Sequence, residues 1–471
     1  MAHPVLETDY LILGSGAAGM AFADTLLHET DASMVIVDKH HSAGGHWNDA
    51  YPFVRLHQPS AYYGVNSRAL GGDGRDAHPL NLGMCERASS AEILAYYDAV
   101  MQSMLASGRV RYFPMSELDA PSTDGSYSFR SLTAGTQAQV RVAKRFVNTA
   151  HLSPQVPSTH PPKYAVAQGV RCVPLNALPR IKEPPPMYVV VGAGKTGIDA
   201  CQWLLDNQVN PDAICWVMPR DSWFINRATV QPGMDFFMHS FGGMATQMEA
   251  ILAASSVDKV FAGLEAGGQM LRLDPRVQPT MYHAAVVSQS ELASLRQIKN
   301  IVRMGRVQRI DAQQIVLERG AVSMPEGALV VDCSASIPVG HAVPPVFSAS
   351  AITPQFVRAH QPTFSAALIA WVEAHYTSDE EKNALCRPVS LPHNPRSWLA
   401  MQLASMANRQ AWSKDKALNA WIRASRLDGF SALAGQIAPT DAEKMAVLQR
   451  FGKAAGPAAA KLQELLAADG R

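Results

Sequence analysis

Two segments of the 471-residue sequence show the same succession of an apolar strand, a glycine-rich turn and a helix. The first runs from Thr8 to Glu29 and the second from Met187 to Asn207, and each leads into another short apolar strand. A strand that passes through such a turn into a helix begins a parallel βαβ unit, so the sequence predicts an α/β fold with two Rossmann-like units. Both turns fit GxGxxG, with Gly14, Gly16 and Gly19 in the first and Gly192, Gly194 and Gly197 in the second.

The first glycine turn has the features of a dinucleotide-binding site. Its first glycine permits the tight turn, its second lets the backbone approach a pyrophosphate, and its third allows close helix packing. Asp38 ends the following strand, 19 residues after Gly19, where a carboxylate can accept hydrogen bonds from ribose hydroxyls. Gly45 and Trp47 follow in a loop that can pass close to the dinucleotide. This arrangement favours FAD over NAD, and an ordinary loop is the alternative.

The second unit differs from the first at the end of its next strand. No acid ends that strand, and Arg220 stands just beyond it. A guanidinium can bind a 2′-phosphate in a bidentate manner, whereas a carboxylate would repel it, so NADPH is predicted rather than NADH. Lys195 adds positive charge within the glycine turn, and the neighbouring Asp221 opposes it. Trp223 is expected near the nicotinamide half of the site, with core packing as the alternative.

Two dinucleotide sites in one chain predict one bound cofactor, FAD, and one exchanging hydride donor, NADPH. The run Pro184–Pro186 marks a boundary, because consecutive prolines cannot join a helix or a central strand. We therefore expect an FAD-binding domain over residues 1–160 and an NADPH-binding domain over 184–330. Residues 331–471 are expected to return to the FAD domain and to add a helical C-terminal region. Within that region, Ala454–Leu466 is expected to form a solvated helix.

Composition narrows the classes of function. The 41 basic and 40 acidic residues leave a net charge of +1, so there is no basic field to collect nucleic acid or an anionic membrane. The cysteines form no CxxC pair, which excludes dithiol–disulfide reductase chemistry, and no metal site is predicted. No membrane anchor is expected, because no apolar run reaches the length of a membrane span. The N-terminus lacks the features of a signal peptide, and a cytoplasmic location is expected.

The order of these motifs resembles that of the class B flavoprotein monooxygenases, which are the flavin-containing and the Baeyer–Villiger monooxygenases. Residues 47–55 are similar to the GG-x-W…YPGAR stretch of Baeyer–Villiger enzymes, and residues 148–150 to the ATG link out of the FAD domain. Asp199 stands where the flavin-containing monooxygenases carry an aspartate after GNSG. The segment 220–223 is similar to their Arg–Trp segment, which binds NADPH. The resemblance covers residues 8–335.

Three features depart from the family pattern. The fingerprint FxGxxxHxxx(Y/F/W/P) is missing, because Val173 follows Gly169 where the histidine would stand. Leu56 and His57 follow Arg55 in place of an acidic residue. The last glycine of the ATG link is also absent. The sequence therefore indicates a divergent member, and ketone oxygenation does not follow from the resemblance.

The resemblance implies a reaction in which NADPH reduces the flavin and dioxygen then forms a C4a-peroxyflavin. One oxygen atom passes from it to a small organic substrate. Arg55 is the candidate to favour the anionic peroxide, and His57 the candidate to move a proton, since an imidazole titrates near neutral pH. The alternatives are that Arg55 holds a phosphate or a carboxylate of the fold and that His57 is structural.

Two other functions compete with oxygen insertion. An FAD-dependent NADPH reductase or oxidase without oxygen insertion is the alternative function. A flavin-binding protein without turnover is disfavoured, because the complete second glycine turn with Arg220 would serve only a flavin that is reduced. The sequence leaves the oligomeric state open, with a homodimer among the states it allows.

Overall fold

The computed structural model describes residues 5–72, 74–119, 126–151, 155–334 and 343–468. The N-terminal part of the chain builds a sheet in the order β3-β2-β1-β6-β5-β4, with β19 added against β6. Strands β3, β2, β1 and β6 run parallel, and β4 and β5 continue the sheet as an antiparallel extension. The strands are β1 (Val5–Leu13), β2 (Met34–Val37), β3 (Val110–Phe113), β4 (Ser116–Leu118), β5 (Tyr127–Ser131), β6 (Gln137–Asn148) and β19 (Ala351–Ile352).

Three helices cover this sheet. Helix α1 (Ala17–Glu29) leaves the first glycine turn and packs against α7 (Pro362–His375), a helix more than 330 residues further along the chain. Helix α2 (Ser90–Ala106) begins at a capping box, in which Ser89 and Glu92 satisfy each other's backbone N–H groups. Strand β2 is buried along its whole length, as expected of an apolar strand in a parallel sheet.

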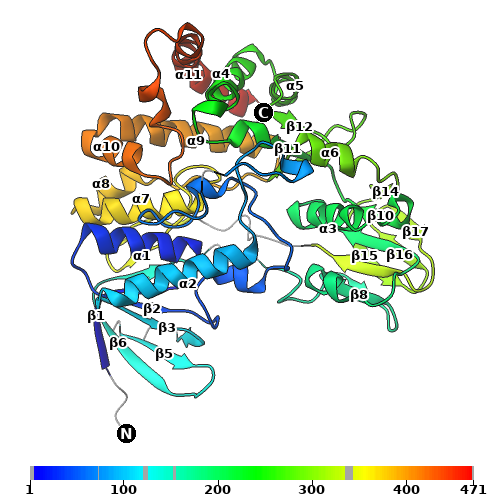
Figure 1. Ribbon diagram of the computed structural model, residues 1–471, viewed down its shortest axis with the longest axis horizontal. Helices are drawn as coiled ribbons and strands as arrows, with labels where there is room; N and C mark the ends of the chain where they lie inside the picture. The colour runs from blue at the N-terminus through cyan, green and yellow to red at the C-terminus, as the bar shows by residue number, and fades with distance from the viewer. Residues whose placement is uncertain (1–4, 73, 120–125, 152–154, 335–342, 469–471) are drawn as a thin grey trace.

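A second parallel sheet lies to the right in Figure 1 and has the order β14-β10-β9-β18-β8. Its central strand leads through the second glycine turn into α3 (Lys195–Asp206), beside which α6 (Gln289–Leu295) packs. The prediction of an α/β fold with two Rossmann-like units is therefore confirmed. The strands are β8 (Arg171–Pro174), β9 (Tyr188–Val191), β10 (Ile214–Val217), β14 (Ile301–Val302) and β18 (Leu329–Asp332).

Two smaller sheets flank this second unit. One pairs β11 with β13 in parallel and with β12 in antiparallel orientation, and the other has the order β17-β16-β15-β7. The strands are β7 (Ala165–Val166), β11 (Ser222–Asn226), β12 (Met270–Leu271), β13 (Met281–Val287), β15 (Val307–Asp311), β16 (Gln314–Leu317) and β17 (Gly320–Ser323).

The C-terminal region is helical, as predicted, and forms a layer at the top of Figure 1. Helix α11 packs against α4 and α9 and buries Ala454, Ala458, Leu462 and Leu465. The helix predicted over Ala454–Leu466 is present, but only one of its faces is solvated, because α4 and α5, which lie inside the second unit in sequence, supply an apolar partner for the other face. The helices are α4 (Phe237–Ala253), α5 (Val257–Ala266), α8 (Asp379–Leu385), α9 (Pro395–Lys414), α10 (Lys416–Ala424) and α11 (Ala442–Ala468).

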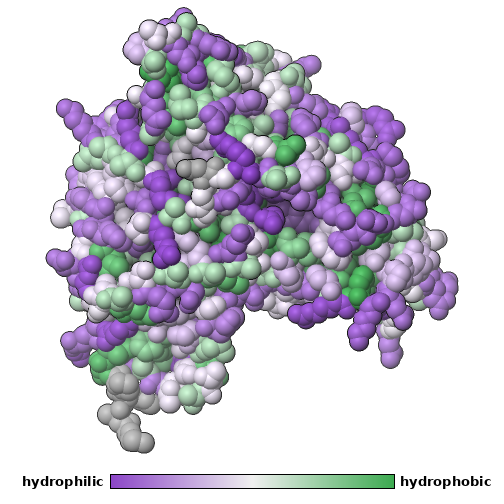
Figure 2. Space-filling model, viewed as in Figure 1, coloured by the Kyte–Doolittle hydropathy of each residue, from purple (hydrophilic) through white to green (hydrophobic). Residues whose placement is uncertain are grey.

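The outline of the molecule is indented between the two nucleotide-binding units. Figure 2 shows this indentation at the lower edge, and on the visible face hydrophobic groups are scattered among hydrophilic ones. Within the described part of the chain, no helix has both the length and the apolar character needed to cross a membrane.

Candidate active site

The first glycine turn is held in shape by close backbone packing. Gly14 has a φ of +101°, and a side chain on Gly19 would place its Cβ 2.0 Å from the Gly14 carbonyl oxygen. Gly16 is the N-cap of α1, and a Cβ on Gly45 would lie 2.7 Å from the Gly16 Cα. Gly45 therefore lies directly against the glycine turn, where the N-terminus of α1 can face a phosphate.

Asp38 stands at the carboxyl end of β2, next to the first glycine turn, but its carboxylate is already occupied. One oxygen accepts the Ser15 backbone N–H at 2.5 Å and the Ser15 hydroxyl at 2.8 Å. The other accepts the backbone N–H and Nδ1 of His40, both at 2.8 Å. These four bonds fill the acceptor positions of a carboxylate, so a ribose hydroxyl would have to share or displace one of them.

His40 lies between two carboxylates. Its Nδ1 contacts Asp38, and its Nε2 is 2.9 Å from Asp49 Oδ2. The hydrogen bond with Asp38 raises the pKa of His40 and outweighs its burial, and Asp49 adds to the effect. Burial alone would raise the pKa of Asp38, yet the hydrogen bonds from His40 and Ser15 hold it below its ordinary value. Sequence reasoning placed the aspartate correctly and missed this network.

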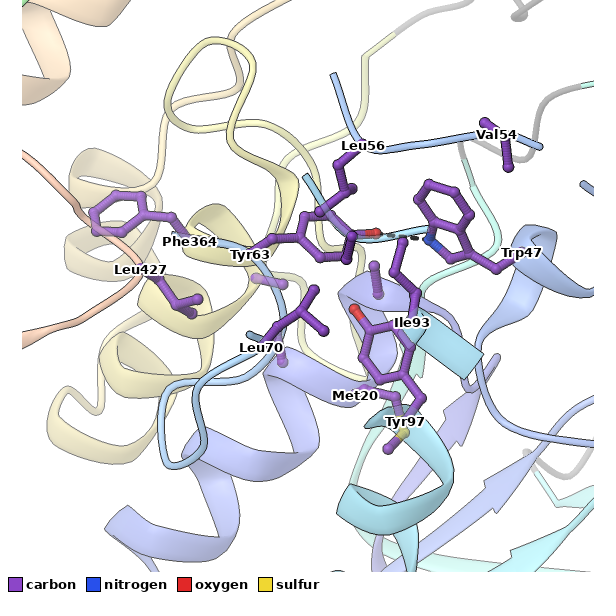
Figure 3. Packing of buried hydrophobic residues seen from close by; sticks show 14 of the residues in the cluster. Met20, Trp47, Val54, Leu56, Tyr63, Leu70, Ile93, Tyr97, Phe364 and Leu427 are labelled. Atoms are coloured by element: carbon purple, nitrogen blue, oxygen red, sulfur yellow. Dashed lines mark hydrogen bonds between the residues drawn. The ribbon is translucent and has the colours of Figure 1, made fainter. Parts of the chain in front are cut away.

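Trp47 is buried beside the same loop and points toward the interior of the molecule. Its indole N–H donates to the Tyr63 hydroxyl at 2.8 Å, as Figure 3 shows, and the two rings meet edge to face. Tyr97 continues this aromatic cluster from α2. The indole is therefore fixed in one orientation, with one side available to a ligand.

The second glycine turn has open space beside its middle glycine, Gly194, whereas the middle glycine of the first turn, Gly16, packs against Gly45. Side chains on Gly192 and Gly197 would collide with the carbonyl oxygens of Cys333 and Gly192, at 2.7 and 2.2 Å from the added Cβ. A Cβ on Gly194, by contrast, would meet no heavy atom within 4 Å. Gly194 is the N-cap of α3, so this open space lies at the positive end of a helix and fits a pyrophosphate.

Arg220 is exposed just after β10, whereas the neighbouring Asp221 is buried. The carboxylate of Asp221 accepts two hydrogen bonds from Arg303, at 2.7 and 3.1 Å. Because Arg303 neutralises this carboxylate, Asp221 does not cancel the charge of Arg220. The sequence suggested that Asp221 opposes the charge of Arg220. It contained no signal that Arg303, which follows β14, would bind Asp221.

Trp223 is fully buried in an apolar core cluster. Its ring packs against Phe261 at 5.3 Å and beneath the Arg272 guanidinium at 4.7 Å. These contacts belong to the apolar core beneath α5. The expectation that Trp223 lies near the nicotinamide gains no support from them, and they match the alternative of core packing.

One cavity of about 350 Å³ brings together predicted residues from both units. Trp47, Arg55 and His57 line it from the first unit, and Lys195 and Thr196 line it from the start of α3. Most of the remaining wall is aromatic and aliphatic, as is usual for a small-molecule site. The other predicted site residues do not line it: Gly14, Gly16, Gly19, Asp38, Gly45, Gly192, Gly194, Gly197, Arg220 and Trp223. The cavity also has Asp49, Tyr51, Gln58, Tyr63 and Asp332 in its wall, none of which was predicted as a site residue.

Lys195 lines this cavity as a partly buried cation. It forms an ion pair with Asp199, one turn further along α3, and Asp199 Oδ2 accepts the Tyr51 hydroxyl at 2.5 Å. Burial lowers the pKa of Lys195, while Asp199 and Glu291 oppose that change. Phe53 stacks on Trp203 of the same helix, with ring centroids 5.0 Å apart. The segment after β2 is therefore attached to α3 by polar and aromatic contacts.

His57 is held neutral. Burial lowers its pKa well below the ordinary value, and the nearby cations Lys195, Arg227 and Arg87 lower it further. Its ring bonds to the backbone of Ala284, a non-glycine residue with a φ of +56°. A neutral imidazole that donates one N–H to a carbonyl has its second nitrogen free to accept a proton.

Arg55 is exposed at the cavity and has one fixed contact. Its Nη1 donates to the Arg87 carbonyl oxygen at 2.9 Å. Arg87 itself is buried, donates to the Leu56 carbonyl at 3.4 Å, and forms no ion pair with a described carboxylate. Arg227 behind it is fully buried and paired with Glu291. The Arg55 side of the cavity is thus positively charged, and sequence patterns did not point to Arg87 or Arg227.

Comparison with known proteins identifies relatives along almost the whole chain. Residues 12–66 match the family described as an NAD(P)-binding Rossmann-like domain. The uncharacterized proteins Rv2000 of Mycobacterium tuberculosis and Mb2023 of Mycobacterium bovis are each 47% identical to this chain over 465 residues. The match covers 98% of this chain and 85% of theirs.

Solved structures with similar folds include three oxidoreductases. A flavin-containing monooxygenase from Stenotrophomonas maltophilia has 14% identity and a TM-score of 0.47, over 81% of this chain and 99% of its own. An open structure of cyclohexanone monooxygenase has 14% identity and a TM-score of 0.44, over 70% and 73%. A bacillithiol disulfide reductase from Bacillus cereus has 14% identity and a TM-score of 0.39, over 69% and 77%.

Proposed function

The chain belongs to the family of the mycobacterial protein Rv2000, and we propose that it is an NADPH-dependent FAD monooxygenase that acts on a small organic substrate. The observation that carries the proposal is the cavity shared by the two nucleotide-binding units. Trp47 and Arg55 reach it from the first unit and Lys195 from the second. A cavity built in this way lets a bound cofactor and an exchanging hydride donor meet.

The two glycine turns fit their proposed cofactors to different degrees. For NADPH, the open space at Gly194, the N-terminus of α3 and the exposed Arg220 match a pyrophosphate and a 2′-phosphate. For FAD, the N-terminus of α1 at Gly16 can face a pyrophosphate, but Gly45 packs against Gly16 and leaves less open space than there is at Gly194, and Asp38 is at the ribose position. Because Asp38 already accepts four hydrogen bonds, Ser15 or His40 would share the ribose contact.

When bound, FAD supplies hydride acceptance from NADPH and reaction with dioxygen. The protein's own residues would position the reactants and control charge and protons. Trp47, fixed by Tyr63, forms one wall and excludes water. Arg55 places positive charge in the cavity, which favours negative charge on a reacting group, whereas the charge of Lys195 is balanced by Asp199. His57, whose lowered pKa keeps the imidazole neutral, is a weak base here, so its free nitrogen would accept a hydrogen bond from a reactant rather than store a proton.

An FAD-dependent NADPH reductase or oxidase is the second candidate function. It is favoured by the histidine fingerprint that is missing before the second unit, where Val173 stands four residues after Gly169. It is also favoured by the exposure of Arg55, since an exposed guanidinium stabilises a reacting anion less than a buried one does.

Stopped-flow spectroscopy of the purified yellow protein tests both candidates. The flavin is first reduced by NADPH without oxygen, and dioxygen is then admitted. A transient absorbance band in the near ultraviolet, before the oxidised spectrum returns, is expected of the monooxygenase. Direct return of oxidised flavin together with hydrogen peroxide would instead establish the oxidase. Failure of NADPH to bleach the flavin would refute both.

A further inference from the structure

Two imidazoles lie near Arg220 at the end of β10. His283 on β13 and His393, which precedes α9, are both exposed, as Arg220 is. All three come from segments that lie far apart in the sequence. Two of them, the histidines, belong to no motif found in the sequence.

Strand pairing explains how these segments meet. Ser222 of β11 lies opposite Met281 of β13, and Trp223 lies opposite Tyr282. The Asp221 carbonyl accepts the backbone N–H groups of Thr280 and Met281, each at 3.1 Å. Arg220, the residue before Asp221, therefore lies close in space to the start of β13. His283 is the third residue of that strand.

His393 reaches the same place from the C-terminal region. Its carbonyl oxygen accepts the Tyr282 backbone N–H at 3.0 Å, which places it beside the residue that precedes His283. Trp223 and Tyr282, which are paired in register, both point into the core beneath α5. Alternate residues of a strand face opposite sides, so His283 is directed away from that core.

The charges around this surface are positive on balance. Partial desolvation of its ring lowers the pKa of His283, and the charges of Arg220 and His393 lower it further. The neighbouring carboxylates are already neutralised, because Asp221 is bound by Arg303 and Asp274 contacts Arg276 and Arg303. An anion placed here would meet one permanent cation and two imidazoles, without a competing free carboxylate among these groups.

We infer that Arg220, His283 and His393 together form a binding surface for a phosphomonoester, and that this group is the 2′-phosphate of NADPH. The inference rests on the proposed function and adds two specificity-determining residues to it. Arg220 supplies a permanent charge, both imidazoles can donate an N–H group to the phosphate, and His283 takes up a proton when the phosphate dianion binds. NADPH affinity is therefore expected to rise as the pH falls from 8.5 toward 6.5, whereas NADH affinity is not.

Direct binding of NADPH and NADH to the flavin-loaded protein tests the inference. The nicotinamide fluorescence is titrated with wild type, Arg220→Met, His283→Gln and His393→Gln at pH 6.5 and 8.5. His239→Gln, an exposed histidine on α4, is the control. Each of the two histidine variants is expected to weaken NADPH binding about two- to fivefold at pH 6.5, as for an exposed charge pair, and to leave NADH binding unchanged. Across the variants, the affinity for 2′-AMP should change as the affinity for NADPH does, and the affinity for 5′-AMP should change as the affinity for NADH does.

The outcomes separate the two levels of the proposal. If Arg220→Met removes the preference for NADPH while both histidine variants keep it, the inference about the histidines is overturned and the NADPH proposal stands. If NADPH and NADH affinities fall equally in the histidine variants, these residues support the strand pairing and not the phosphate. If wild type itself binds the two dinucleotides equally, the NADPH proposal fails together with the inference.

Discussion

The Tyr51 hydroxyl donates a hydrogen bond of 2.5 Å to Oδ2 of Asp199, a residue 148 positions further along the chain. Asp199 also pairs with Lys195, so one carboxylate joins the segment after β2 to the N-terminal turn of α3. Burial raises the pKa of Tyr51 well above its ordinary value, and the charge of Asp199 adds to this, so the phenol stays protonated and remains the donor. The wall of the cavity is thereby continuous from one nucleotide-binding unit to the other.

Replacing Tyr51 with Phe should weaken this connection without emptying space in the core. Loss of a buried hydrogen bond to a charged acceptor is expected to lower the free energy of unfolding by about 1.5–3 kcal/mol. Urea unfolding measures this value, with Tyr127→Phe as the control, since the Tyr127 hydroxyl has no hydrogen bond to another described residue. Equal losses in the two variants would show that the Asp199 contact adds nothing to stability.

The glycine turns could be predicted from sequence because their constraint is local. Gly14 and Gly19 touch each other across five residues, and no other residue type fits either place. The position of Asp38 follows from the same local pattern. Its partners do not, because His40 is fixed between Asp38 and Asp49 only after the loop beyond β2 has folded back.

The rest of the site depends on contacts that no local pattern contains. Lys195 and Asp199 are four residues apart on a helix and could be paired from sequence, whereas Tyr51 joins them through tertiary packing. Trp223 was expected near the nicotinamide because it follows Arg220 by three residues. A strand turns successive side chains to opposite faces, and the pairing of β11 with β13 directs this one into the core.

Gly194 and Gly197 should respond differently to alanine. An alanine at Gly194 meets no atom and has an allowed φ of −87°, so the free energy of unfolding should fall by less than about 1 kcal/mol. An added Cβ would nevertheless fill the proposed pyrophosphate space, and NADPH affinity should fall at least tenfold. Alanine at Gly197 would place its Cβ 2.2 Å from the Gly192 carbonyl oxygen and should destabilise the fold by about 1–3 kcal/mol or more. NADPH titration and urea unfolding of both variants check this contrast, and unchanged NADPH affinity in Gly194→Ala would place the pyrophosphate elsewhere.

Arg303 should control the choice of dinucleotide without touching it. In Arg303→Met the Asp221 carboxylate loses its two charged hydrogen bonds and stands uncompensated beside Arg220. The preference for NADPH over NADH should fall, by about two- to fivefold if the effect is that of an exposed charge pair. The double variant Arg303→Met/Asp221→Asn should recover the preference, because the uncompensated charge is gone. A double variant that stays as weak as the single one would mean that Arg303 acts through the fold.

His40 should make the stability of the first unit depend on pH. A histidine whose pKa is raised in the folded state contributes stability below its unfolded pKa of about 6.5, and loses it as the pH rises through the folded value. The lowered pKa of Asp38 affects stability at the acidic end of the pH range. Its contribution to the free energy of unfolding is present above about pH 4 and is lost as the pH falls through the folded-state pKa. The pair should therefore stabilise most between about pH 4 and 6.5.

His40→Gln keeps a hydrogen-bonding side chain at this position and removes the titrating charge. Its free energy of unfolding should lie below that of wild type by an amount on the order of 1 kcal/mol near pH 6, and the difference should shrink toward pH 9. His41→Gln, an exposed neighbour, serves as the control. Urea unfolding across this pH range measures both variants. A deficit of constant size from pH 6 to 9 would show that His40 acts through its hydrogen bonds alone and not through its charge.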